Sequence, residues 1–200
     1  KNLISMLSMI MQNAERKFDD PRFQQMTTET LRGAQERMKR LINRLSSPGD
    51  HLDFVLTNCD LRKLLLSLSE EMKLSNQHKI NITFDVDSLP IVRGNEEKLR
   101  SVISNLIINA IEAMPNGGDL RFTVEEGLDT ATLIVQDSGV GLTAEFMRDR
   151  LFRPFQTSKP SGLGIGLFQS RELVEQMGGA LTVASTIGQG SSFKLKLKRA

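Results

Sequence analysis

The chain of 200 residues contains no Trp, no Tyr, one Cys and two His, and its formal net charge is only +2. The absence of Trp and Tyr argues against nucleic-acid bases stacking on aromatic platforms. So small a charge also gives no electrostatic reason to expect nucleic acid or a lipid surface as a partner. The single Cys59 excludes an intrachain disulfide and is typical of a reducing compartment. We expect it to be a small buried or strand-edge residue rather than a nucleophile, and no Cys and His cluster suggests a metal site.

Long apolar runs are also missing. None approaches the roughly 20 residues that a membrane-spanning helix needs, and no signal peptide is recognisable. The chain begins at Lys1 within a helical pattern, so we expect a fragment of a longer protein, in which any membrane anchor would lie outside this piece. The apolar content of 39% and charged content of 25% are typical of a soluble globular protein.

Two amphipathic helices are predicted at the N-terminal end. Apolar residues recur at steps of three and four over residues 3–17 and again from about Phe23 to Leu45, and Asp19-Asp20-Pro21 separates the two stretches. An antiparallel helical hairpin of this kind cannot bury its apolar faces alone, so we expect two copies to form a four-helix bundle. The turn-forming residues 46–50 mark a boundary, and we predict a hairpin domain at 1–48, a linker at 49–57 and a second domain at 58–200.

The second domain combines helices and strands. Asp60 can cap a helix whose apolar residues run from Leu61 to Met72. Alternating apolar residues then predict strands near 80–86, 120–124, 133–137, 181–183 and 193–197. Because most connections are of hairpin length, we predict an α+β fold, a sandwich in which a mixed sheet carries helices on one face.

The stretch from Leu99 to Met114 is the organising helix of this domain. Seven apolar residues at helical spacing form one face, whereas Asn105, Asn109 and Glu112 line up along another edge. Asn is a mediocre helix former because its amide competes for backbone hydrogen bonds. Two Asn residues in register therefore suggest a polar ligand, and a capped or water-facing polar stripe is the alternative.

Three glycine clusters follow this helix. Asp137-Ser138-Gly139-Val140-Gly141 ends a strand, where a fixed carboxylate could accept a hydrogen bond from an exocyclic amine beside a flat ring. Residues 162–167 run Gly-Leu-Gly-Ile-Gly-Leu into a helix, and free N–H groups at a helix start suit phosphates. Residues 188–191 connect two strands. No βαβ unit surrounds the second cluster, which argues against a dinucleotide-binding Rossmann site.

Taken together and in order, these segments resemble a known family. Residues 105–110, 137–141, 152–155, 162–166 and 188–190 look like the N, G1, F, G2 and G3 boxes of sensor histidine kinases. The resemblance covers the chain from about residue 58 to its end. It implies an ATP-binding domain of the Bergerat (GHKL) fold, preceded by a dimerisation hairpin.

The resemblance also implies roles for single residues. It places Mg²⁺ on Asn109, the adenine amine on Asp137 and the phosphates near Gly164 and Gly166, with a mobile lid over about 142–161. Lys159 in this lid either reaches the γ-phosphate or is an exposed loop lysine. The implied nucleotide-binding residues are Asn105, Asn109, Asp137, Gly139, Gly141, Phe155, Lys159, Gly162, Leu163, Gly164, Ile165, Gly166, Leu167 and Ser191.

Asn105 bears on the type of reaction. In the chaperone, mismatch-repair and gyrase ATPases of this fold the matching residue is a Glu that activates water, and Asn cannot act as that base. We therefore expect the site to hold ATP without hydrolysing it quickly. After Asn109 the sequence departs from the commonest family pattern, which leaves the role of Glu112 open.

The N-terminus resembles the end of an H-box. Lys1-Asn2-Leu3 matches the last part of His-Asp-Leu-Lys-Asn, which would put the phosphoacceptor His three residues before Lys1. Asn2 then matches a position that orients water for removing phosphate from the response regulator. His51 and His78 do not fit the motif, so we expect the fragment to bind nucleotide but not to autophosphorylate.

The sequence thus predicts the cytoplasmic kinase core of a two-component sensor histidine kinase. This homodimer would bind ATP and Mg²⁺ and pass the γ-phosphoryl group through a His to an Asp of a response-regulator receiver domain. The alternatives are a hydrolytic ATPase of the same fold, an anti-sigma-type serine kinase and a nucleotide-sensing dimerisation module without enzymatic activity. The first needs a general base that Asn105 does not provide, and the second usually lacks a dimerising hairpin.

Overall fold

A computed structural model describes residues 20–45, 55–74, 80–85, 90–157 and 164–200. The chain divides into two compact units, Lys1–Leu52 and Asp53–Ala200, and each is described by itself. The predicted helix over residues 3–17 and the predicted boundary at 46–50 lie outside the described residues.

Helix α2 (Pro21–Leu45) is the described element of the first unit. Pro occupies its first position, where the missing N–H is not needed. The Asp20 carboxylate accepts a hydrogen bond from the Arg22 N–H at 2.9 Å, which caps the helix start. The predicted second helix therefore exists and begins two residues earlier than expected, while its pairing into a hairpin and bundle stays a prediction.

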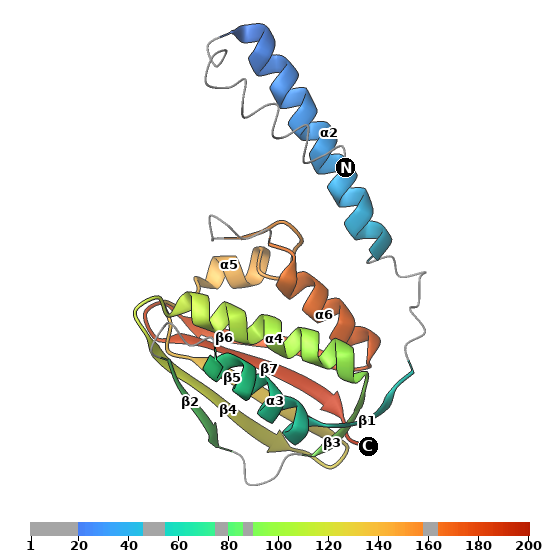
Figure 1. The fold of residues 1–200 in the computed structure, drawn as a ribbon, viewed down its shortest axis with the longest axis vertical. Coiled ribbons are helices and arrows are strands. Elements are labelled where there is room, and N and C mark those ends of the chain that lie inside the picture. The colour runs from blue at the N-terminus through green and yellow to red at the C-terminus, as the bar shows by residue number, and fades with distance from the viewer. Residues whose placement is uncertain (1–19, 46–54, 75–79, 86–89, 158–163) are drawn as a thin grey trace. The chain divides into compact units, whose positions relative to one another are not determined.

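The second unit is built on a five-stranded sheet (Figure 1). Its order is β2-β4-β5-β7-β6, with β2 parallel to β4 and all other neighbours antiparallel. Three helices cover one face of this sheet (Figure 1). The predicted α+β fold, with a mixed sheet and helices on one face, is confirmed. The strands are β2 (Ile80–Asp85), β4 (Gly118–Glu126), β5 (Thr130–Asp137), β6 (Ala180–Thr186) and β7 (Gly190–Lys198), and the helices are α3 (Leu61–Leu74), α4 (Glu96–Ala113) and α6 (Gly166–Gln176).

Three short elements were not predicted. Strands β1 (Thr57–Asp60) and β3 (Ile91–Gly94) form a separate antiparallel pair, and helix α5 (Ala144–Asp149) lies within the segment expected to be a lid. Elements of four to six residues are too short to show a clear hydrophobic period. Cys59 is 2% exposed on β1, so it is both buried and on a strand of a two-stranded sheet, as expected.

Helix α4 carries the centre of the core. Its N-cap Asn95 accepts a hydrogen bond from the Lys98 N–H at 3.1 Å, so the helix begins three residues before the predicted start. Its apolar face packs into the hydrophobic core, and the fully enclosed side chains include Leu99, Ile103 and Leu106. The polar edge of the same helix, with Asn105 and Asn109, is only partly buried and is available to line a site.

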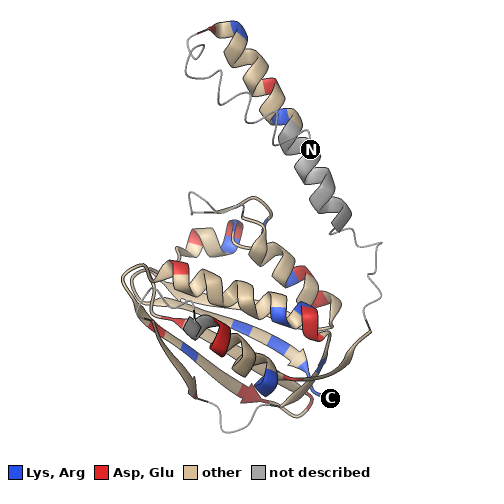
Figure 2. Ribbon diagram, in the orientation of Figure 1, with Lys and Arg blue, Asp and Glu red and all other residues tan. Residues whose placement is uncertain are grey.

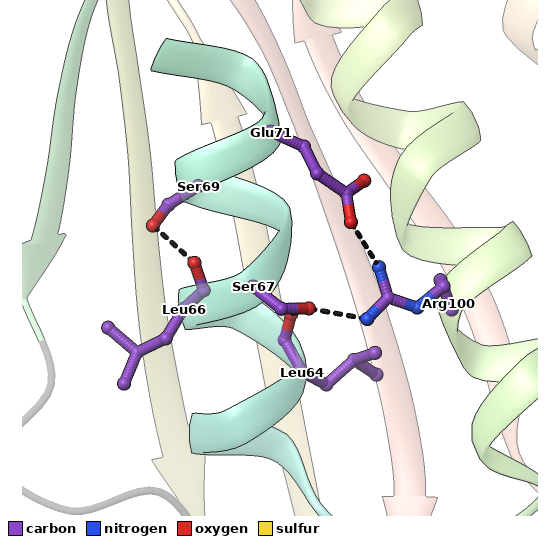
Figure 3. A network of polar contacts seen from close by, with 6 residues as sticks. All are labelled: Leu64, Leu66, Ser67, Ser69, Glu71 and Arg100. Atoms are coloured by element: carbon purple, nitrogen blue, oxygen red, sulfur yellow. Dashed lines mark hydrogen bonds and ion pairs between the residues drawn. The ribbon is translucent and has the colours of Figure 1, made fainter. Parts of the chain in front are cut away.

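Helix α3 joins α4 through both apolar and polar contacts. Arg100 on α4 donates hydrogen bonds to Glu71 and to the Ser67 hydroxyl on α3 (Figure 3). The Arg100–Glu71 pair is partly exposed, and pairs of this kind contribute at most about 1 kcal/mol. The buried Leu64, Leu65 and Leu68 on α3 therefore contribute more to its attachment.

Charged residues of both signs are distributed over the helices and strands (Figure 2). On β7, for example, Lys194 forms an ion pair with Glu125 of β4 at 3.4 Å. Within the ranges given above, no helix has the length and apolarity that crossing a lipid bilayer requires.

We expect Ile103→Ala to lower the free energy of unfolding by about 2–5 kcal/mol, because Ile103 is 0% exposed and the substitution leaves a cavity in the core. Ile108→Ala is a matched control on the same helix, since Ile108 is 53% exposed and should change stability by less than about 0.5 kcal/mol. Urea unfolding followed by circular dichroism measures both. Equal losses in the two variants would contradict this packing of α4.

Candidate functional site

A cavity of about 560 Å³ lies in the second unit, between the polar edge of α4 and the turns at the ends of the central strands. Residues from α4, β5, α5, the start of α6 and β7 contribute to its wall. The lining residues are Asn105, Ile108, Asn109, Glu112, Ala113, Asp137, Val140, Gly141, Leu142, Phe146, Leu151, Gln156, Thr157, Gly164, Ile165, Gly166, Leu167, Ser191 and Phe193.

The polar edge of α4 faces this cavity. Asn105, Asn109 and Glu112 follow one another at helical spacing, and all three line the wall. The Asn105 amide donates a hydrogen bond at 3.0 Å to the hydroxyl of Ser170 on α6, which is 3% exposed. At Gly166 a Cβ atom would collide with the amide group of Asn105, so a larger residue there would require the Asn105 side chain to move.

Asp137 forms the polar floor at the end of β5. Its side chain is 4% exposed, and its Oδ1 accepts hydrogen bonds from the Gly139 N–H at 2.9 Å and the Ser191 N–H at 3.2 Å. The strand register places Asp137 opposite Ser191 on β7. Because a buried carboxyl group needs hydrogen-bond donors, these two N–H groups stabilise its position at the cavity wall.

The three glycine clusters bring backbone segments together around the cavity. Gly141 has φ +71°, and a Cβ atom there would collide with the Thr186 carbonyl group. The Gly188 N–H donates to the Val140 carbonyl at 2.8 Å, which joins the first cluster to the third. Gly164 has φ +67° and packs against the backbone of Gln156.

The structure brings most of the predicted nucleotide-binding residues to this one cavity. Those that line it are Asn105, Asn109, Asp137, Gly141, Gly164, Ile165, Gly166, Leu167 and Ser191. Gly139 and Phe155 do not line it. Gly139 packs beneath Asp137 against Ala113, and Phe155 has φ +63° with its N–H bonded to the Gly164 carbonyl at 2.9 Å. Asn2, Lys159, Gly162 and Leu163 lie outside the described residues.

Sequence reasoning missed the apolar part of the wall. Ile108, Val140, Leu142, Phe146, Leu151 and Phe193 come from several elements, and nothing in their local spacing connects them. A cavity with apolar walls and few polar groups is suited to a flat ligand whose polar edge meets those groups. Ile108 precedes Asn109 directly, and Val140 and Leu142 flank Gly141 of the first glycine cluster, so adjacency to predicted residues was the available signal for these three.

Charged and aromatic contacts flank the cavity without lining it. On α5, a side-chain hydrogen bond from Arg148 lowers the pKa of Asp149 from its ordinary value, and both groups are exposed to solvent. The Arg171 guanidinium lies over the Phe152 ring at 5.3 Å from its centroid, which joins α6 to the turn after α5.

No group of three or more His, Cys, Asp or Glu that could hold a metal ion occurs among the residues whose structure is given above.

Comparison with known proteins agrees with this arrangement. The family described as "Histidine kinase-, DNA gyrase B-, and HSP90-like ATPase" matches residues 94–200. Sensor histidine kinase ZraS of Escherichia coli K12 is 34% identical over 164 residues, which cover 81% of this chain and 35% of ZraS. The C4-dicarboxylate transport sensor protein DctB of Rhizobium meliloti is 40% identical over 109 residues, 54% of this chain and 17% of DctB. The chain thus spans about a third or less of these relatives.

Solved structures share the fold. Full-length ShkA in complex with AMPPNP superposes with a TM-score of 0.68 at 25% identity, covering 90% of this chain and 40% of ShkA. The Acinetobacter baumannii histidine kinase AdeS has the same TM-score at 20% identity over 99% of this chain and 95% of that one, which shows a common fold. Since the family match covers more than half of the sequence and includes the α4 edge, Asp137 and the glycine clusters, the chain belongs to the histidine kinase-, DNA gyrase B- and HSP90-like ATPase family.

Proposed function

We propose that this chain is the kinase core of a two-component sensor histidine kinase and that the cavity of the second unit binds ATP with Mg²⁺. The observation that carries the proposal is the convergence of Asn105, Asn109, Asp137 and two glycine turns on one cavity. The sensor histidine kinases among the sequence relatives, and the AMPPNP bound to ShkA, support the same function.

Each part of the cavity has a role in this proposal. The buried Asp137 carboxylate accepts a hydrogen bond from the adenine amine, and the apolar walls around Ile108 and Phe193 hold the ring. At the other end, backbone N–H groups near Gly164 and Gly166 at the start of α6 contact the phosphates. Gly162, Leu163 and Lys159 would complete that end.

Asn109 would hold the Mg²⁺ ion, whose remaining ligands would be phosphate oxygens and water. An amide oxygen is a hard neutral ligand, so it suits a cation whose charge the phosphates already balance. When bound, the ion offsets negative charge on the phosphates during phosphoryl transfer.

The γ-phosphoryl acceptor in this proposal is a His of a helical hairpin, and the final acceptor is an Asp of a response-regulator receiver domain. Helix α2 would belong to that hairpin and pair with a second copy of the chain. At the predicted water-orienting position, Asn2 would serve dephosphorylation of the regulator. A cytoplasmic location follows from this role, because ATP and receiver domains are found there.

Slow hydrolysis distinguishes this function from that of an ATPase of the same fold. The Asn105 amide N–H donates a hydrogen bond to the hydroxyl of the buried Ser170. An amide is too weak a base to take a proton from water, so Asn105 cannot activate water for hydrolysis. The site is therefore expected to retain ATP until a protein acceptor is in place.

We expect Asp137→Asn to weaken binding of ADP by roughly tenfold to a hundredfold, because the amide that replaces one carboxylate oxygen cannot accept the adenine amine. Asp129→Asn is the matched control. Asp129 is exposed and directly precedes the first residue of β5, at the far end of the strand from Asp137. The Asp129→Asn variant should therefore bind ADP with the affinity of the wild type. Isothermal titration calorimetry with Mg²⁺ present measures both constants. Wild-type affinity in Asp137→Asn would contradict the proposed orientation of the nucleotide.

We expect the 200-residue chain to bind ATP, hydrolyse it at a rate close to the buffer background, and gain no acid-labile phosphate from γ-labelled ATP. The reasons are that Asn105 is no general base and that neither His51 nor His78 fits the acceptor motif. Steady-state phosphate release and label retention on the protein are the measurements. Sustained turnover would favour the hydrolytic ATPase. Label on His51 or His78 would contradict the prediction that the phosphoacceptor His lies before Lys1.

A further inference from the structure

Three polar side chains lie in one row across the end of the sheet. Asp137 on β5 is opposite Ser191 on β7, and Ser191 is opposite Ser185 on β6. Residues directly opposite one another on neighbouring strands have side chains on the same face. Asp137 and Ser191 line the cavity, whereas Ser185 lies behind them, outside its wall.

The Ser185 hydroxyl takes part in three hydrogen bonds. Its Oγ accepts from the Leu142 N–H at 2.8 Å and donates to the Gly190 carbonyl at 2.8 Å. Its third partner is the Ser191 hydroxyl at 3.1 Å. The directions of the first two are dictated by chemistry, because an N–H can only donate and a carbonyl oxygen can only accept.

Counting protons decides the direction of the third bond. A serine hydroxyl has one hydrogen and two lone pairs, and Ser185 uses its hydrogen on Gly190. In the remaining contact Ser185 must therefore accept, so Ser191 donates its own hydrogen toward Ser185. The Ser191 oxygen is then left with lone pairs, and it can only accept hydrogen bonds from a ligand in the cavity.

We propose that Ser185 is a positioning residue that determines nucleotide specificity by holding the Ser191 hydroxyl as an acceptor. This inference rests on the proposed function and goes beyond it. With the hydrogen of Ser191 turned away, the base end of the cavity presents the acceptor oxygens of Asp137 and Ser191. A base with an exocyclic amine can donate to these acceptors. A base with a carbonyl at the same position would place its own lone pairs against those of Asp137 and Ser191, which weakens binding.

Inosine nucleotides test this idea most directly, because hypoxanthine has a carbonyl where adenine has its amine. We expect the wild-type chain to bind ADP at least roughly tenfold more tightly than IDP, since an unmatched buried acceptor costs about this much affinity. In Ser185→Ala the Ser191 hydroxyl can rotate and donate to the carbonyl. The ratio of the two dissociation constants should then fall by roughly three- to tenfold.

A double-mutant cycle separates this role from a structural one. If Ser185 acts through Ser191, then Ser185→Ala should change the ADP/IDP ratio in the wild-type background but leave it unchanged in a Ser191→Ala background. Ser185→Thr retains the hydroxyl and should keep the wild-type ratio. A general loosening of the turns would weaken both nucleotides equally and leave the ratio as it was in every variant.

The outcomes distinguish the two proposals. A wild-type chain that binds neither nucleotide, with Mg²⁺ supplied, overturns the proposed function itself. Binding of ADP with the same ratio in Ser185→Ala as in the wild type, or an equal change in both backgrounds, overturns the role of Ser185. If Ser185→Ala does not fold, as judged by circular dichroism, Ser185→Cys keeps the side-chain volume. Its weaker hydrogen bonding should lower the ratio in the same direction.

Discussion

The burial of one carboxyl group constrains much of the second unit. Asp137 is almost inaccessible to solvent, and placing a carboxylate in such surroundings costs several kcal/mol unless donors compensate. The compensating N–H groups belong to Gly139 and Ser191, which are separated by more than fifty residues of chain. The turn at Gly139, the turn before Ser191 and the register of β5 against β7 must therefore all be in place for the Asp137 carboxyl group to have its hydrogen-bond donors.

Backbone segments around this group approach so closely that side chains would not fit. A Cβ atom on Gly190 would collide with the Asp137 carbonyl, and one on Gly141 would collide with that of Thr186. Both glycines also have positive φ angles, which L-residues rarely adopt. Part of the cavity wall is therefore backbone packed closely against backbone.

Helix α4 serves the core and the site at the same time. Its apolar face supplies the fully buried Ile103 and Leu106, and its polar edge supplies Asn105 and Asn109 to the cavity. The hydrogen bond from Asn105 to Ser170 joins this edge to α6, whose first residues also line the cavity. Packing of the core and geometry of the site are thus linked through one helix.

A similar coupling connects the cavity to residues behind it. Ser185 does not itself line the cavity, yet the Ser191 hydroxyl, which does, is fixed in direction because Ser185 Oγ already donates to the Gly190 carbonyl and accepts from the Leu142 N–H. Through this hydrogen-bond chain, the backbone groups bonded to Ser185 determine the orientation of the Ser191 hydroxyl that faces the cavity.

The sequence by itself determined the features that repeat over short distances. The period of apolar residues located α4 with both of its faces and the five strands of the main sheet, and the glycine clusters pointed to turns near Asn109 and Asp137. Tertiary structure alone decided what depends on partners far apart in the chain. It formed β1, β3 and α5, which are too short for a period, and it assembled the apolar wall. It also kept Gly139 and Phe155 out of the cavity and turned the Ser191 hydrogen toward Ser185, because close contacts and hydrogen-bond direction are properties of pairs of groups rather than of local sequence.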